Sequence, residues 1–211
     1  MAYRWQAIGD LCVENRTVIA PDSPVAAKLP FLGLEHIESV TGRILYDGLT
    51  SSNHGHGTAF LFDARHVLYC KLRPYLNKVA VPDFAGRCST ELVPLLPRPG
   101  VSKDFLAWIL RRPQTVQAAM QERTGARMPR ANMRHVLAQE VLVPDSIQEQ
   151  QHLADELTRR MNLVIETSLA YQRQLHLLDA YEQKILSEFP FPLKITDTEK
   201  DNRLADDESS S

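Results

Sequence analysis

The stretch from Ser146 to Phe189 constrains the fold of this chain more than any other feature. It contains no glycine and no proline, and it is rich in Leu, Glu, Gln, Arg and Ala, which are good helix formers. Ser146 followed three residues later by Glu149 is typical of a helix start, and Pro190 ends the stretch. The sequence therefore predicts a helix of roughly 42 residues, or about 63 Å at about 1.5 Å per residue. A compact domain does not need a helix of that length.

Mostly apolar residues recur along this predicted helix in alternating steps of three and four, which is the period of a left-handed coiled coil. We call this series the seam; it consists of Ile147, Gln150, Ala154, Leu157, Met161, Val164, Ser168, Tyr171, Leu175, Leu178, Glu182 and Ile185. If two copies pair antiparallel about Ser168, apolar residues meet apolar residues. The inner pairs are Leu157–Leu178, Met161–Leu175 and Val164–Tyr171, and the outer, less well matched pairs are Ala154–Glu182 and Gln150–Ile185.

The seam predicts that the helix forms an antiparallel coiled coil in a homodimer, because a two-fold axis requires a self-complementary surface. We expect the dimer interface to contain Leu157, Met161, Val164, Ser168, Tyr171, Leu175, Leu178 and Ile185. The alternative is that the seam packs on this chain's own domain or on another protein. Leu153, Ile165, Leu169 and Leu177 lie off the seam, so a second face is available to another partner.

The composition is that of an ordinary globular protein of 211 residues, with 44% hydrophobic and 24% charged residues. No apolar run approaches the length of a membrane span, and the first residues lack the apolar core of a signal peptide. Three isolated cysteines, Cys12, Cys70 and Cys88, make neither a disulfide framework nor a metal site. These features lead us to expect a cytoplasmic protein that does not bind a membrane.

The net charge of −2 conceals a gradient along the chain. Residues 1–146 hold 17 Lys and Arg against 13 Asp and Glu, whereas residues 147–188 hold 4 against 7 and residues 189–211 hold 3 against 6. The first part is therefore mildly basic and the rest acidic. This distribution permits nucleic-acid binding by the first part but does not require it.

The pattern upstream of the long helix predicts a globular α+β (mixed α/β) domain at 1–145. Residues 5–13 could form a strand or a short helix, and strand-like runs occur at 31–40, 58–62, 67–70, 87–96 and 140–143. Helices are predicted at 103–112, with Ser102 as the cap, at 114–121 and, as a short turn, at 132–137. The long helix at 146–189 follows, and the acidic tail at 190–211 is predicted to be disordered.

Catalytic motifs are weak in this sequence. It contains no Gly-rich phosphate loop ending in Gly-Lys-Ser/Thr and no fingerprint of an adenine methyltransferase. Asp83 and Glu91 resemble a metal-dependent nuclease pattern, but Val93 occupies the position where that pattern has Lys. His54 and His56 are a weak metal-binding signal. We therefore expect no catalytic residues and no bound metal, with the nuclease kept as an alternative.

A group of basic and polar residues offers a better functional signal. It contains Lys71, Arg73, Tyr75, Lys78, Arg127, Arg130 and Asn132. Arg and Asn can read base edges, and Lys and Arg can hold phosphates. These residues are our candidates for contacts to double-stranded DNA. The alternative is a solvated charged surface without a ligand.

Six short motifs span residues 5–150 in order. They are Trp5-x-x-Ile8-Gly9-Asp10-Leu11, Phe31-Leu32-Gly33-Leu34-Glu35-His36-Ile37, Val67-Leu68-Tyr69-Cys70-Lys71-Leu72-Arg73-Pro74-Tyr75-Leu76, Gly86-x-Cys88-Ser89-Thr90-Glu91, Thr124-Gly125-x-x-Met128-Pro129-Arg130 and Val143-Pro144-x-x-Ile147-Gln148-x-Gln150. In order and spacing they resemble the specificity subunits of type I restriction–modification systems.

The resemblance implies a DNA target-recognition domain at 1–145 followed by a helical spacer. Such subunits are non-catalytic; they bind methyltransferase subunits, which use S-adenosylmethionine, and a restriction/translocase subunit. This chain departs from the usual pattern of two recognition domains and two helices, since it has one of each. Two copies paired through the seam would restore that pattern. A half-subunit that only bridges to another specificity subunit is the second hypothesis.

Overall fold

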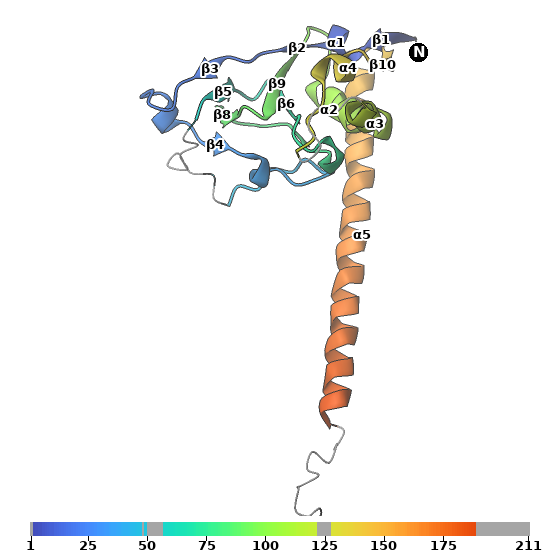
Figure 1. Ribbon diagram of the computed structural model, residues 1–211. Helices are drawn as coiled ribbons and strands as arrows, with labels where there is room; N and C mark the ends of the chain where they lie inside the picture. The colour runs from blue at the N-terminus through green and yellow to red at the C-terminus, as the bar shows by residue number, and fades with distance from the viewer. Residues whose placement is uncertain (1, 48, 50–56, 122–127, 189–211) are drawn as a thin grey trace, which may run out of the picture. The chain divides into compact units, whose positions relative to one another are not determined.

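The computed structural model describes residues 2–47, 49, 57–121 and 128–188 (Figure 1). The chain divides into two compact units, Met1–Asn162 and Leu163–Ser211. Three of the predictions fall outside the described residues: the role of Arg127, the histidine pair His54 and His56, and the disordered tail at 190–211.

The strands of the first unit form three sheets within its described residues (Figure 1). One sheet pairs β1 (Tyr3–Ala7) with β10 (Glu140–Pro144). The second has the order β2 (Cys12–Glu14), β9 (Leu92–Pro97), β6 (Val67–Cys70) and β7 (Val79–Ala80). The third has the order β3 (Val18–Ile19), β5 (Ala59–Phe62), β8 (Gly86–Ser89) and β4 (Phe31–Leu32). Neighbouring strands are antiparallel except for the parallel pair β4 and β8.

Two of the predicted strands differ from the structure. The run at 31–40 is a strand only at β4, because the Gly33 amide donates to Nδ1 of His36 and closes the 3₁₀ turn η2 (Leu34–His36). The run at 87–96 is not one strand but two, β8 and β9, which belong to different sheets and are joined by a short turn. The Glu91 amide donates to Oγ of Ser89, so this polar pair favours a turn between them.

The remaining short elements follow local signals. The short helix α1 (Ile8–Leu11) lies between β1 and β2. Two more 3₁₀ turns occur, η1 (Ala26–Lys28) and η3 (Pro74–Leu76). Helix α2 (Lys103–Arg111) begins where the Ser102 hydroxyl accepts a hydrogen bond from the Phe105 amide. Helices α3 (Pro113–Gln121) and α4 (Met133–Leu137) match the predicted positions within a residue.

Strand β6 separates two hydrophobic clusters. Val67 and Tyr69 belong to the first cluster, which also contains Leu106 of α2 and Val141 of β10. Leu68, the residue between them, belongs to the second. Successive side chains of a strand point to opposite faces, so a strand covered on both faces is apolar without alternation. This accounts for the continuous apolar run Val67–Cys70.

The predicted long helix is confirmed as α5 (Ile147–Glu188), which has 42 residues. The Glu149 amide donates to Oγ of Ser146, as expected for a cap. The first turns pack on the chain's own domain, since Gln150 is 2% and Ala154 0% exposed. The side-chain amide of Gln150 donates to the carbonyls of Gly100 and Pro144. The alternative of packing on the same chain therefore holds for these two seam positions.

The second unit contains the rest of α5. Its seam residues are exposed, with relative exposures of 62% for Val164, 64% for Tyr171, 60% for Leu175 and 63% for Leu178. Such an exposed, mostly apolar stripe is typical of a surface that binds another protein. Among the described residues, no helix has the length and apolar character needed to cross a membrane.

Candidate nucleic-acid interface

Two segments far apart in the sequence pair next to the end of β6. Leu72 and Arg130 form an antiparallel bridge, and backbone hydrogen bonds of 2.8 Å run from the Arg73 amide to Pro129 and from the Ala131 amide to Lys71. This pairing places three of the predicted residues on adjacent segments. We call Lys71, Arg73 and Arg130 the basic cluster.

An acidic side chain from the β8–β9 turn lies within the basic cluster. The carboxylate of Glu91 accepts hydrogen bonds from Nε and Nη2 of Arg130, at 2.9 and 2.8 Å to Oε1. The ammonium of Lys71 is 3.9 Å from Oε2 of the same carboxylate. The hydrogen bonds and charge of Glu91 raise the pKa of Arg130 further. The three cations of the basic cluster together with the carboxylate of Glu91 therefore have a positive net charge.

Among the described candidates for DNA contacts, Arg73 and Tyr75 are the two that are exposed. Both side chains are exposed, Tyr75 to 52%. Arg73 has the left-handed backbone conformation, with φ of +51°, and so does Asn77 at +48°. These two residues flank η3, and the side-chain amide of Asn77 donates to the carbonyl of Arg111, which anchors the turn on α2. The fold thus presents Arg73 and Tyr75 to solvent on a fixed turn.

The other described candidates have structural contacts. The ammonium of Lys78 donates to the carbonyl of Leu34 at 2.8 Å. Oδ1 of Asn132 accepts a hydrogen bond from the Arg134 amide and caps α4. A role for Lys78 or Asn132 in DNA binding stays a prediction, and Arg127 lies outside the described residues.

The two carboxylates of the alternative nuclease pattern are both engaged by neighbours. Asp83 accepts a hydrogen bond from the Tyr46 hydroxyl at 3.0 Å, which raises the pKa of Tyr46. Glu91 holds Arg130. Over the described ranges, no group of three or more His, Cys, Asp and Glu side chains is placed to hold a metal ion.

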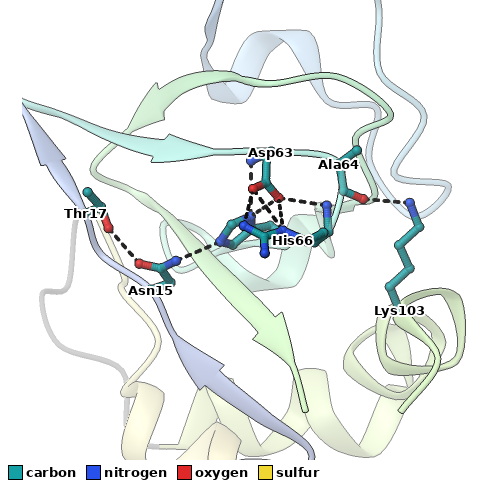
Figure 2. A network of polar contacts seen from close by, with 7 residues as sticks. Asn15, Thr17, Asp63, Ala64, His66 and Lys103 are labelled. Atoms are coloured by element: carbon teal, nitrogen blue, oxygen red, sulfur yellow. Dashed lines mark hydrogen bonds and ion pairs between the residues drawn. The ribbon is translucent and has the colours of Figure 1, made fainter. Parts of the chain in front are cut away.

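A polar network that the sequence analysis did not identify joins the β5–β6 turn to its neighbours (Figure 2). The buried ring of His66 lies 2.9 Å from the Asp63 carboxylate and 3.0 Å from the Asn15 side-chain amide. Asp63 also accepts from the side chain and the amide of Arg65, and these bonds hold the pKa of Asp63 well below its usual range. The sequence signal that could have revealed this network is Asp63, because Asp is favoured at the first position of a tight turn.

The same network reaches α2. The ammonium of Lys103 donates to the carbonyl of Ala64 at 2.8 Å, as Figure 2 shows. Asn15 in turn accepts from the Thr17 hydroxyl. The network therefore ties the turn between β5 and β6 to the segment after β2 and to the start of α2. Its role is structural: the bonds of Asp63 to Arg65 and His66 hold the turn, and those of Asn15 and Lys103 connect it to other elements of the fold.

One curated protein is similar to this chain in sequence. No model of a known protein family matches the chain. The chain is 30% identical over 152 residues to the type I restriction enzyme EcoDI specificity subunit of Escherichia coli. The match covers 69% of this chain and 31% of that protein.

Two solved structures share the fold. The HsdS subunit from Thermoanaerobacter tengcongensis superposes with a TM-score of 0.61 at 19% identity, over 92% of this chain and 51% of that one. A chain from a structure describing complex assembly and conformational transition of the type I R-M system superposes with a TM-score of 0.65, with the same identity and coverage.

The fold, with its mixed α and β domain followed by a long helix, is therefore that of the HsdS class of proteins. More particularly, the chain is related to the specificity subunits of type I restriction–modification systems, as its motifs predicted. It spans 31% of the curated relative and 51% of each of the two solved chains.

Proposed function

We propose that this chain is the DNA-recognition subunit of a type I restriction–modification complex and that it acts as an antiparallel homodimer. The observation that carries the proposal is the exposed apolar seam of α5, which is complementary to a second, antiparallel copy about Ser168. The basic cluster supports DNA as the ligand.

A two-fold dimer reads two identical half-sites in inverted orientation, so the target is an interrupted palindrome. The 42 residues of α5 limit the spacing. At about 1.5 Å per residue and about 3.4 Å per base pair, a helix of about 63 Å corresponds to at most roughly 18 base pairs. Arg73 and Tyr75 are the first candidates for DNA contacts, because both side chains are exposed on a fixed turn.

The chain itself is non-catalytic in this proposal. The chemistry belongs to methyltransferase subunits, which use S-adenosylmethionine, and to a restriction/translocase subunit. Leu169 and Leu177 are 48% and 68% exposed and lie off the seam, so they offer a second apolar face to the methyltransferase. This face is separate from the one that pairs two copies.

The decisive experiment is a map of modified bases across the host genome, with and without the gene for this chain. Loss of methylation at one interrupted palindrome in the deletion strain is the expected result. Loss at an asymmetric bipartite motif would mean that the chain works beside a second specificity subunit. No change would contradict the proposed reading role.

The homodimer has its own test. Replacing Leu157, Met161 and Leu178 by Asp places charges in the seam, and light scattering should then report monomers. A triple variant that remains dimeric would contradict the seam assignment. Far-UV circular dichroism would establish that the variant is still folded.

A further inference from the structure

An apolar hollow of about 210 Å³ lies beside the first turns of α5 in the first unit. Its lining includes Trp5, Trp108, Ile109, Arg112, Leu142 and Leu157. Trp5 and Leu142 are directly paired in the β1–β10 sheet, which Figure 1 shows next to the start of α5. Relative exposures of 66% for Trp5 and 46% for Leu142 are high for such large apolar side chains.

The seam places the hollow at a defined point of the proposed homodimer. In the antiparallel register, Leu157 meets Leu178 of the second copy. The next two pairs would be Ala154 with Glu182 and Gln150 with Ile185. Those pairs cannot form, because Ala154 and Gln150 are already buried against their own domain. In the proposed homodimer, Glu182 and Ile185 of the second copy would instead face the surface of that domain beside Leu157.

The surface next to Leu157 fits these two side chains. Trp5 and Leu142 present an apolar pair for Ile185, which is itself 47% exposed. Arg112, at the hollow, is partly exposed, and no ion pair of Arg112 is found in the part of the chain that the structure describes. It offers a cation to the carboxylate of Glu182. The surface therefore offers an apolar contact for Ile185 and a cation for Glu182.

We infer that the hollow is the docking site for the end of α5 of a second copy, with Ile185 against Trp5 and Leu142 and with Glu182 paired with Arg112. This inference rests on the proposed homodimer and adds a contact that the coiled coil alone does not contain. Each domain then holds the far end of the partner's helix. The dimer would be fixed at both ends as well as along the seam.

Cysteine cross-linking tests the contact directly. Leu142→Cys and Ile185→Cys are prepared as separate variants and mixed, so that a mixed disulfide joins two chains. A disulfide requires Cα atoms within about 7 Å. The matched control replaces Ile185→Cys by Glu166→Cys, which lies about 28 Å earlier along the helix. Ser168→Cys, at the two-fold axis, reports the homodimer independently.

The outcomes separate the two proposals. A 142–185 link without a 142–166 link supports the docking site. A Ser168 link without a 142–185 link overturns the docking site and leaves the homodimer standing. The absence of both links, with a monomer mass by light scattering, overturns the homodimer and the docking site with it.

Charge reversal provides a second measurement. Arg112→Glu and Glu182→Arg should each weaken the dimer by about fivefold, and the two together should restore it. Arg173→Glu is the matched control, since it makes the same change off the seam. Trp5→Ala should weaken the dimer by about 30-fold, as expected for a large aromatic anchor. Equal dimer constants for Arg112→Glu, Trp5→Ala and the control would overturn the inference.

Discussion

The carboxylate of Glu91 holds the guanidinium of Arg130 through two nitrogens, with Nε and Nη2 at 2.9 and 2.8 Å from Oε1. Glu91 comes from the β8–β9 turn and Arg130 from the segment before α4. The contact orients one cation of the basic cluster and offsets part of its charge.

Glu91→Gln should tighten the binding of duplex DNA. The substitution removes the carboxylate that pairs with Lys71 and Arg130. The negative charge that repels DNA phosphates is then lost. We expect about a fivefold gain in affinity at low salt and a steeper loss of affinity as salt is raised. Fluorescence anisotropy with a labelled duplex measures both. An unchanged salt dependence would mean that the cluster does not face DNA.

Arg73→Asn should weaken DNA binding without unfolding the domain. Asn tolerates the left-handed conformation that Arg73 adopts, so the turn is kept while the charge is lost. We expect about a tenfold loss of affinity and a salt slope smaller by about 1. The control is Arg160→Ala, which removes a cation from α5. Equal losses in both variants would argue against a specific role for Arg73.

Gln150→Ala should destabilise the fold. Gln150 is 2% exposed, and its side chain accepts from the Ser102 amide and donates to two carbonyls. Removing it leaves buried polar groups without partners, at a cost of about 2 kcal/mol in the free energy of unfolding. Urea denaturation measures the change. The exposed neighbour Gln148→Ala serves as control and should change it by less than about 0.5 kcal/mol.

Asp63→Asn should destabilise the protein in a pH-dependent way. The bonds from Arg65 hold the pKa of Asp63 below its ordinary value, so the folded state favours the ionised form. The stabilisation is complete above the ordinary carboxyl pKa and is lost as the pH falls through the lowered one. At pH 7 we expect a loss of about 1 kcal/mol, which shrinks toward pH 2. Thermal melts across this range test it.

Asp179→Asn is the control for the Asp63 variant, because it makes the same change on an exposed part of α5. A loss of stability in Asp63→Asn that stays constant from pH 7 to pH 2 would show that the ionised carboxylate is not what stabilises the turn. In that case the backbone geometry alone would account for the β5–β6 connection.

The three cysteines should react slowly with thiol reagents in the folded protein. Burial raises the pKa of Cys12 and Cys88 to about 12 and that of Cys70 to about 11, so little thiolate is present at pH 8. Labelling with a chromogenic disulfide should be complete only after denaturation. Fast labelling of the native protein would contradict this, and would require cysteine-free variants for the cross-linking experiment.

Sequence alone determined the elements that depend on near neighbours. The bounds of α5 and the cap at Ser102 follow from residues within one turn of each other, so their signals are local. The motifs also predicted the relationship to specificity subunits, which the comparisons confirm. Lys71, Arg73 and Arg130 were identified by residue type, and nothing in the sequence placed Arg130 next to the other two.

Only the tertiary structure decided which distant segments meet. Leu72 pairs with Arg130, and Glu91 accepts hydrogen bonds from Arg130. Both faces of β6 are covered by other elements. Each of these contacts joins residues that lie tens of positions apart. The same holds for the seam, whose period predicted a partner but not that Gln150 and Ala154 would pack on their own domain. Local periodicity reports which face of an element is apolar, whereas the choice of what covers that face depends on the whole chain.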